Sequence, residues 1–282
     1  MIRLAEGTLL SFIEGSSLIK RGKQPDWLEK SIDFQLSGIR KGSTVLDFEA
    51  PKLEETLRDV QLPIFTDVDI EQIRSDSAIG FSMFAYNKAI EADYESYILD
   101  KNLLKEMSNF SKLINTEGHE ILISSELKQQ IFTIKKEFID KIKSIEQQTP
   151  ESIPAKISGK LDVLKHTSSQ LEIITENRRL HAFLSPSAKI ENTVPFFGKE
   201  VTATGKANFK PSRELKSFEI ESIKLSEPAD EYFKQIPKAL FNEVELQRLM
   251  RKQKYEGTVI DNLIGKWPGD ESIDELLDLI QK

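Results

Sequence analysis

The strongest constraint on the fold is a two-residue alternation in the middle of the chain. Apolar or small residues occupy every second position from Val201 to Phe209, and polar residues occupy most positions between them. A period of two is typical of a strand with one buried face. Gly205 lies within this run, which indicates a bend, a bulge or a close approach of another backbone.

Similar alternation recurs through the stretch from Pro154 to Ser226, where the pattern predicts five short strands. A less regular connection, Ser185 to Gly198, separates the third strand from the fourth. A phase slip near Ser222 in the fifth strand indicates a β-bulge. Five short strands with one interruption are typical of a small closed barrel, either OB-like or SH3-like.

Residues 1–148 are predicted to form an α+β domain. Asp100 is expected to cap one of its helices, because a carboxylate at that position accepts hydrogen bonds from the first helical turn. The elements expected here are a strand at Thr8–Ile13, a hairpin within Ile32–Ala50, helices at Ser77–Ala92 and Asp100–Ile114, a short strand at Ile121–Ile123, and a lysine-rich helix from Ser124 or Ser125 that carries Ile131, Ile134, Phe138, Ile142 and Ile145.

The predicted fold class is therefore α+β, in three parts. An α+β domain spans residues 1–148, the small five-stranded β-barrel spans residues 149–226, and a helical C-terminal region with an acidic tail spans residues 227–282. Two prolines in the polar run from Thr149 to Pro154 mark the link into the barrel. Two helices, Pro228–Leu240 and Phe241–Lys254, are expected after it.

Composition excludes several classes of protein. The 282 residues include no cysteine, so disulfides, cysteine nucleophiles and thiolate metal sites are excluded, and a cytoplasmic location is expected. The first residues lack the apolar run of a signal peptide, and no apolar stretch reaches membrane-spanning length. We therefore expect a soluble chain with no membrane partner. The oligomeric state stays open.

No motif predicts catalysis, a metal or a cofactor. His119, His166 and His181 are not spaced as zinc ligands, and neither a phosphate-binding loop nor a nucleophile elbow is present. The acidic run Asp67-Val68-Asp69-Ile70-Glu71 lacks the glycine and the terminal glutamate of a calcium-binding loop. No catalytic residue is assigned, and an enzyme is not predicted.

The net charge of −7 is unevenly distributed. Residues 154–226 contain 12 basic and 8 acidic side chains, a net charge of +4, whereas the rest of the chain carries −11. A basic barrel within an acidic chain offers one functional alternative, a nucleic-acid-binding module. The residues expected to contact nucleic acid in that case are Lys206, Lys210, Arg213 and Lys216.

The last 27 residues form an acidic tail with seven acidic side chains and two lysines. Trp267 lies in a run stiffened by a proline, and Asp270 is placed to cap a short final helix. The apolar face of that helix consists of Ile273, Leu276, Leu277 and Ile280. A helix of about ten residues is unstable alone in water, so it must dock either on this chain or in a groove of a partner.

Gly265–Glu271, followed by Asp274–Leu277, resembles the C-terminal tail of bacterial antitoxin-type proteins, which are partners of PIN-domain ribonuclease toxins. The barrel sequence is similar to a barrel found in bacterial proteins related to these antitoxins. The similarity lies in Gly198–Val201, Gly205 and Phe209–Ser212. The N-terminal domain departs from the small DNA-binding domain that such antitoxins usually carry.

The resemblance implies a protein partner that the tail occludes. In this hypothesis Trp267 anchors in a pocket of the partner, and the apolar helix face fills a groove. Asp270, Glu271 and Asp274 would pair with basic residues near the partner's active site.

Overall fold

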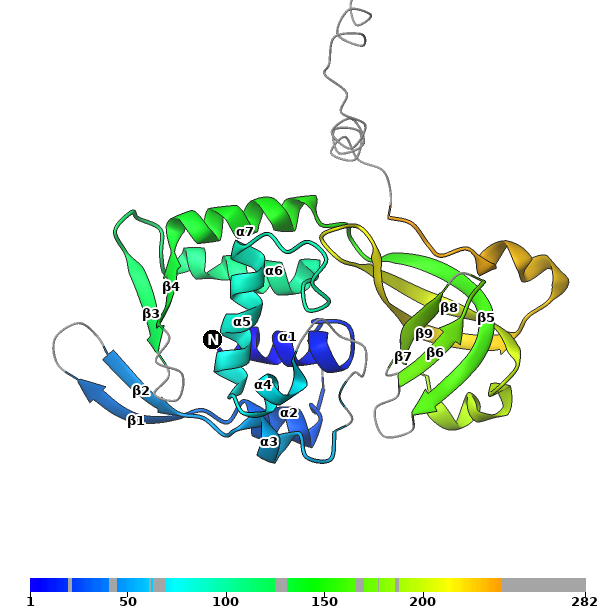
Figure 1. Cartoon of the computed structure of the whole chain (residues 1–282), viewed down its shortest axis with the longest axis horizontal. Helices are drawn as coiled ribbons and strands as arrows, with labels where there is room; N and C mark the ends of the chain where they lie inside the picture. The colour runs from blue at the N-terminus through cyan, green and yellow to red at the C-terminus, as the bar shows by residue number, and fades with distance from the viewer. Residues whose placement is uncertain are drawn as a thin grey trace, which may run out of the picture. The chain divides into compact units, whose positions relative to one another are not determined.

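The computed structural model describes residues 1–19, 22–40, 45–60, 62, 69–124, 131–165, 170–176, 178–185 and 188–239 (Figure 1). The chain divides into two units, residues 1–239 and 240–282, and the first contains all the described residues. It holds both helices and strands, including a closed five-stranded β-barrel, which confirms the predicted fold class. Among the described residues, no helix is long and apolar enough to cross a membrane.

The N-terminal part is built on helices that share one hydrophobic core, with buried members from Leu4 to Ile145. Two helices have side-chain caps: Ser77 accepts a hydrogen bond from the Gly80 amide at 3.2 Å, and Asp100 accepts one from the Leu103 amide at 3.0 Å. The described helices of this part are α1 (Ile2–Ile13), α2 (Asp26–Ser31), α3 (Leu53–Thr56), α4 (Ile70–Arg74), α5 (Ala78–Ile90), α6 (Lys101–Ser108), the 3₁₀ turn η1 (Asn109–Lys112) and α7 (Lys136–Gln148).

The strand predicted at Thr8–Ile13 is wrong, because these residues lie in helix α1. Ten of the 12 residues of α1 are buried. The run Leu9-Leu10-Ser11-Phe12-Ile13 is short and mainly apolar, and such a run fits either a strand or a buried helix.

Two antiparallel hairpins extend from the helices. Strands β1 (Gln35–Arg40) and β2 (Val45–Glu49) confirm the hairpin predicted within Ile32–Ala50. Strands β3 (Glu120–Ser124) and β4 (Ile131–Lys135) form the second. The helix predicted through this region is therefore partly wrong, since Ile131 and Ile134 lie on β4 and α7 begins only at Lys136. A short apolar run fits either element, and pairing with β3 decides this case.

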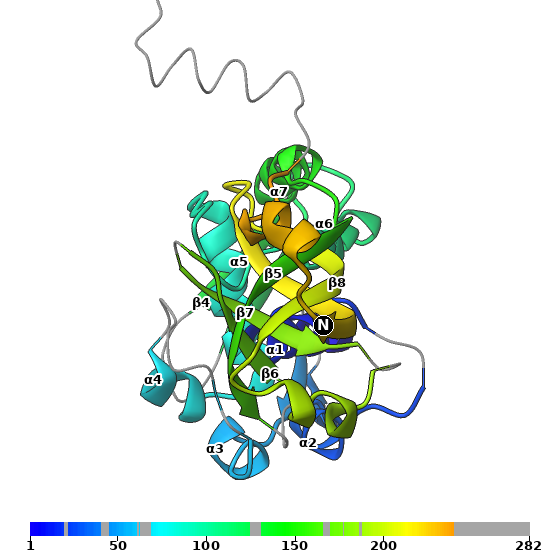
Figure 2. The same ribbon diagram turned by 90° about the vertical axis from the view of Figure 1, so that its right-hand side faces the viewer.

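The barrel has its own hydrophobic core, with buried members from Ile157 to Ile220. Its strands are joined in the order β5-β6-β7-β9-β8, and the barrel closes between β8 and β5 (Figure 2). All pairs are antiparallel except β7 with β9, which is parallel. The strands are β5 (Ile153–Lys165), β6 (Gln170–Ile174), β7 (Arg179–Leu184), β8 (Glu200–Phe209) and β9 (Leu215–Leu225).

Gly205 is required by the close approach of β9. A Cβ atom at this position would lie 1.8 Å from the carbonyl oxygen of Glu219, too close for any side chain. The register of β8 and β9 shifts here, because Thr204 pairs with Ser222 and Gly205 pairs with Ile220. The predicted bulge near Ser222 is confirmed.

Short 3₁₀ turns cover the rest of the barrel. The predicted irregular connection contains η2 (Ile190–Asn192) and η3 (Val194–Phe196). Beyond β9, η4 (Pro228–Lys234) packs on β5, where an α-helix was expected to run to Leu240. Asp230 fixes η4 by accepting hydrogen bonds from the amide of Glu227 and the hydroxyl of Thr202. The predicted helix Phe241–Lys254 lies outside the described residues.

Candidate functional site

A buried polar cluster surrounds Lys216 of β9, where the barrel meets the helices. Its Nζ atom lies 2.8 Å from Oδ2 of Asp100 and 3.1 Å from the carbonyl oxygen of Ile98, and it also donates to the hydroxyl of Ser11. The side chain of Lys216 is 0% exposed and that of Asp100 is 7% exposed. An ammonium group has three N–H donors, and these three acceptors are enough to receive all of them within the protein.

Asp100 is held for this contact by its place at the start of α6. It accepts hydrogen bonds from the amides of Leu103 and Ser17, both at 3.0 Å, and from the hydroxyl of Ser17. Burial opposes ionisation of this carboxyl, but the charge of Lys216 and the hydrogen bonds outweigh it, so the pKa of Asp100 lies below its usual value. The pair is therefore charged.

A serine beside a lysine is also the arrangement of Ser–Lys hydrolases, in which a neutral lysine acts as the base. Here Lys216 is paired with a carboxylate, Asp100, whose pKa lies below its usual value. Ser11 is fully buried and also donates to the carbonyl oxygen of Ile98. The cluster thus joins two parts of the fold.

Other polar contacts surround the ion pair. The Tyr97 ring lies over the Lys216 ammonium, 5.7 Å from Nζ to the ring centroid, and meets the His181 ring edge-on with centroids 6.4 Å apart. Burial raises the pKa of Tyr97 to about 12. Ser217 donates to the carbonyl oxygen of Gly15 at 2.6 Å, and Gln170 donates to that of Ile13. We call this set of contacts the junction.

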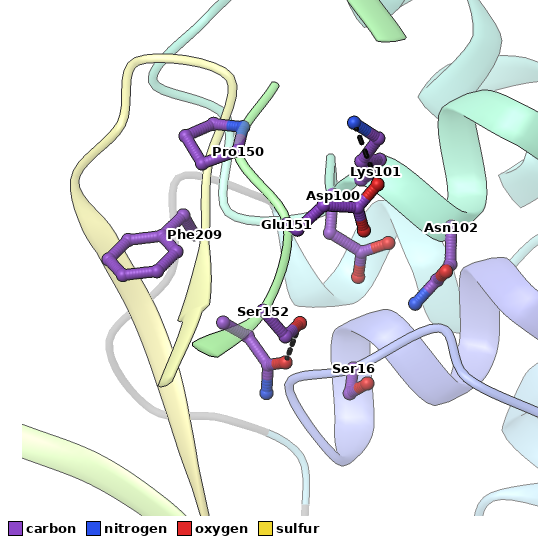
Figure 3. Close-up of a pocket in the computed structure, with 9 residues that line it drawn as sticks. Ser16, Asp100, Lys101, Asn102, Pro150, Glu151, Ser152 and Phe209 are labelled. Atoms are coloured by element: carbon purple, nitrogen blue, oxygen red, sulfur yellow. Dashed lines mark hydrogen bonds and ion pairs between the residues drawn. The ribbon is translucent and has the colours of Figure 1, made fainter. Parts of the chain in front are cut away.

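A small cavity of about 40 Å³ lies beside the junction (Figure 3). Two polar contacts line it. Nζ of Lys101 lies 3.0 Å from Oε1 of Glu151, and the Ser152 hydroxyl donates to Oδ1 of Asn208 at 2.7 Å. This volume holds a few water molecules and is too small for an organic substrate. The lining residues are Ser16, Asp100, Lys101, Asn102, Pro150, Glu151, Ser152, Asn208 and Phe209.

The four basic residues of the nucleic-acid alternative are not all presented together. Lys206 is exposed on β8 and lies 3.7 Å from Glu221. Lys210 and Arg213 belong to the turn between β8 and β9, where Lys210 lies 4.0 Å from Glu95. The prediction that Lys216 contacts nucleic acid is wrong for this structure, because its side chain is buried in the junction and cannot offer its charge to a phosphate from there.

The other sequence-based candidates are placed as follows. Every residue predicted to bind a protein partner, from Trp267 to Ile280, lies outside the described residues, as do His166 and Asp67. Within the part that the structure describes, no three His, Asp or Glu side chains are placed to hold a metal ion.

The role of Asp100 beyond its cap was not predicted, and Lys216 was predicted to be a surface cation. The run from Lys216 to Ile220 is buried at every position. The sequence holds one sign of this, because Lys216 is in phase with Phe218 and Ile220, the apolar positions of the strand.

A scan against protein-family models matched none, and no curated protein matches the chain.

Proposed function

We propose that this chain is an antitoxin-like protein-interaction protein, whose acidic segment 256–282 binds a partner protein and covers its active site. The segment combines an anchor, Trp267, with a row of apolar residues at helical spacing and carboxylates on the other face. A short amphipathic helix of this kind gains order by docking in a groove. A PIN-domain ribonuclease is the class of partner that the resemblance implies.

Among the described residues, the observation that supports a protein-interaction role is the apolar face of the β1–β2 hairpin. Leu36 pairs with Phe48 and Ile39 pairs with Leu46, which puts four apolar side chains on one face. Their exposed fractions are 53%, 51%, 69% and 46% in that order. Contiguous exposed apolar surface on a soluble protein usually marks contact with another protein.

The proposal is tested by co-expressing the chain with the product of the adjacent reading frame. Co-purification is expected, together with inhibition of single-stranded RNA cleavage by that product. Trp267→Ala should weaken binding by about 2 kcal/mol or more, near 30-fold, as loss of an interface anchor does. Tyr232→Ala is the matched control, since this tyrosine is 76% exposed and lies before the segment.

Equal capture by the full chain and by a chain that lacks residues 256–282 would contradict the tail's role. Unchanged RNA cleavage despite tight binding would instead contradict occlusion of the active site.

The second candidate function is a nucleic-acid-binding module, and the strand order of the barrel favours it. Insertion of β9 between β7 and β8 gives the Greek-key path of OB-like barrels. Such barrels bind oligonucleotides on their second and third strands, here β6 and β7, and on the loop between the fourth and fifth strands, here residues 210–214. Binding that weakens with salt would support this candidate, and affinity flat with salt would reject it.

A further inference from the structure

The segment Asp93–Asp100, which follows α5, has an unusual composition for a connection. Its eight residues, Asp-Tyr-Glu-Ser-Tyr-Ile-Leu-Asp, include three carboxylates and two tyrosines. Asp93 is bound to Lys88 of α5 at 3.0 Å, so it stays with its own domain. The other two carboxylates, Glu95 and Asp100, both meet lysines of the barrel.

The segment lies along the side of the barrel that OB-like barrels use for ligands. Asp100 is bound to Lys216 at the start of β9, and Glu95 lies 4.0 Å from Lys210 in the β8–β9 turn. The amide of Ser212 in the same turn donates to the carbonyl oxygen of Tyr94 at 3.0 Å. The Tyr97 ring meets His181 of β7.

These contacts repeat the chemistry by which barrels hold single-stranded nucleic acid. Such sites combine cations that pair with phosphates and flat side chains on which bases stack. In this structure carboxylates lie at the lysines, where phosphates would lie, and the Tyr97 ring meets His181 edge-on, at an interplanar angle of 79°, so it contacts the imidazole without stacking on it. The segment is thus an acidic and aromatic substitute for a ligand.

The contact is also of a separable kind. The helical core and the barrel core share no residues, and the junction consists of an ion pair, hydrogen bonds and the ring contacts of Tyr97. Polar interfaces between domains resemble transient protein contacts, and relative motion is the default expectation for them. An internal ligand also competes at a high effective concentration, which lowers the affinity of the site for any external ligand.

We propose that Asp93–Asp100 is an internal pseudo-ligand, which occupies a single-stranded nucleic-acid site on the barrel and excludes nucleic acid until it is displaced. The site consists of Lys210 and Arg213 of the β8–β9 turn, with His181 of β7 as its flat side chain. This inference rests on the second candidate function, and is independent of any role of residues 256–282.

The test is to weaken the segment without altering the barrel. Glu95→Gln with Tyr97→Ala removes one carboxylate charge and the ring without adding a cation beside Lys210, while Asp100 keeps both its ion pair and its cap of α6. Glu91→Gln with Tyr232→Ala is the matched control, because it changes charge and tyrosine content equally at two exposed positions that the structure places outside the junction.

Two measurements are made on the full chain and both double variants. Fluorescence anisotropy with single-stranded oligo(dT) and oligo(U) of about 16 nucleotides, within the range of one barrel, gives the affinity over a salt series. Hydrogen exchange at the Ser212 amide reports directly whether the segment has left the barrel.

The expected result is faster exchange at Ser212 and at least tenfold tighter, salt-dependent binding in the Glu95→Gln, Tyr97→Ala variant alone. Adding Lys210→Gln to it should then weaken binding and reduce the salt slope by about one. Equal binding by all three proteins would overturn the pseudo-ligand while leaving the barrel a nucleic-acid site. Faster exchange with no binding by any protein would overturn the second candidate function, and the inference with it.

Discussion

Lys216 and Asp100 are 116 residues apart in sequence, yet the ammonium of one lies 2.8 Å from the carboxylate of the other, and both side chains are buried. The ion pair connects β9 of the barrel to the start of α6. A buried pair adds little net stability, because both charges lose their water, but loss of one partner leaves the other charge uncompensated. We therefore expect replacement of one partner to lower the free energy of unfolding much more than replacement of both.

Lys216→Met should lower the free energy of unfolding by about 3–5 kcal/mol, since Asp100 would remain buried without its cation. Lys216→Met combined with Asp100→Asn should recover most of that loss, because the neutral amide keeps the helix cap. Urea unfolding of the four proteins gives the double-mutant cycle. A cost below about 1 kcal/mol for Lys216→Met would show that the pair is solvated.

The ion pair also predicts a dependence on acid. Burial opposes the charge of Asp100, but Lys216 and the hydrogen bonds hold its pKa below the usual value in the folded state. The stability it contributes is therefore present above the unfolded-state pKa of about 4, and is lost as pH falls through the lower folded pKa. Thermal midpoints measured from neutral to acidic pH should show the advantage over the Lys216→Met, Asp100→Asn protein shrinking below about pH 4. An advantage that grows on acidification would contradict the assignment.

Gly205→Ala should disrupt the barrel. The added methyl group would lie 1.8 Å from the Glu219 carbonyl oxygen, so β8 and β9 must separate where the bulge brings them together. We expect a loss above about 3 kcal/mol, comparable to severe overpacking. Gly7→Ala in α1 is the control with the opposite sign: its nearest contact would be an ordinary 3.4 Å, and alanine favours a helix by about 0.5–1 kcal/mol. Similar stability of the two variants would contradict the close approach.

Because the apolar face of the β1–β2 hairpin is exposed, polar replacements there should change self-association but not the free energy of unfolding. Leu46→Ser with Phe48→Ser should change the free energy of unfolding by less than about 1 kcal/mol, because both side chains are already half exposed. It should reduce self-association at high concentration, as measured by light scattering. Leu53→Ala, at a fully buried position, should cost about 2–5 kcal/mol. Equal losses in the two proteins would show that the hairpin face is packed.

The barrel strands were predictable because a half-buried strand has apolar residues on its buried face and polar residues on the other, which gives a visible alternation in the sequence. Gly205 is recognisable for a related reason, since a glycine inside such a run requires a backbone explanation. Helix α1 was mistaken for a strand because its second half is a short, mainly apolar run, which fits a strand as well as a buried helix. Ile131 and Ile134 fit both a strand and a helix, and only the partner strand β3 decides between them.

The candidate site was harder to predict than the fold. Lys216 is in phase with the apolar residues Phe218 and Ile220, but the carboxylate that compensates its charge, Asp100, belongs to another domain. Local patterns carry no information on such a partner. The cap role of Asp100 was predictable because a cap is local, whereas its ion pair was not.

The order β5-β6-β7-β9-β8 has a consequence for synthesis on the ribosome. The last strand made, β9, lies between two earlier ones, so no closed barrel exists until Leu225 has emerged. At about 5–20 residues per second, Lys216 follows Asp100 by roughly 6–23 s. Asp100 therefore leaves the ribosome well before its cation does, and the ion pair between the helical part and the barrel can form only after Lys216 has emerged.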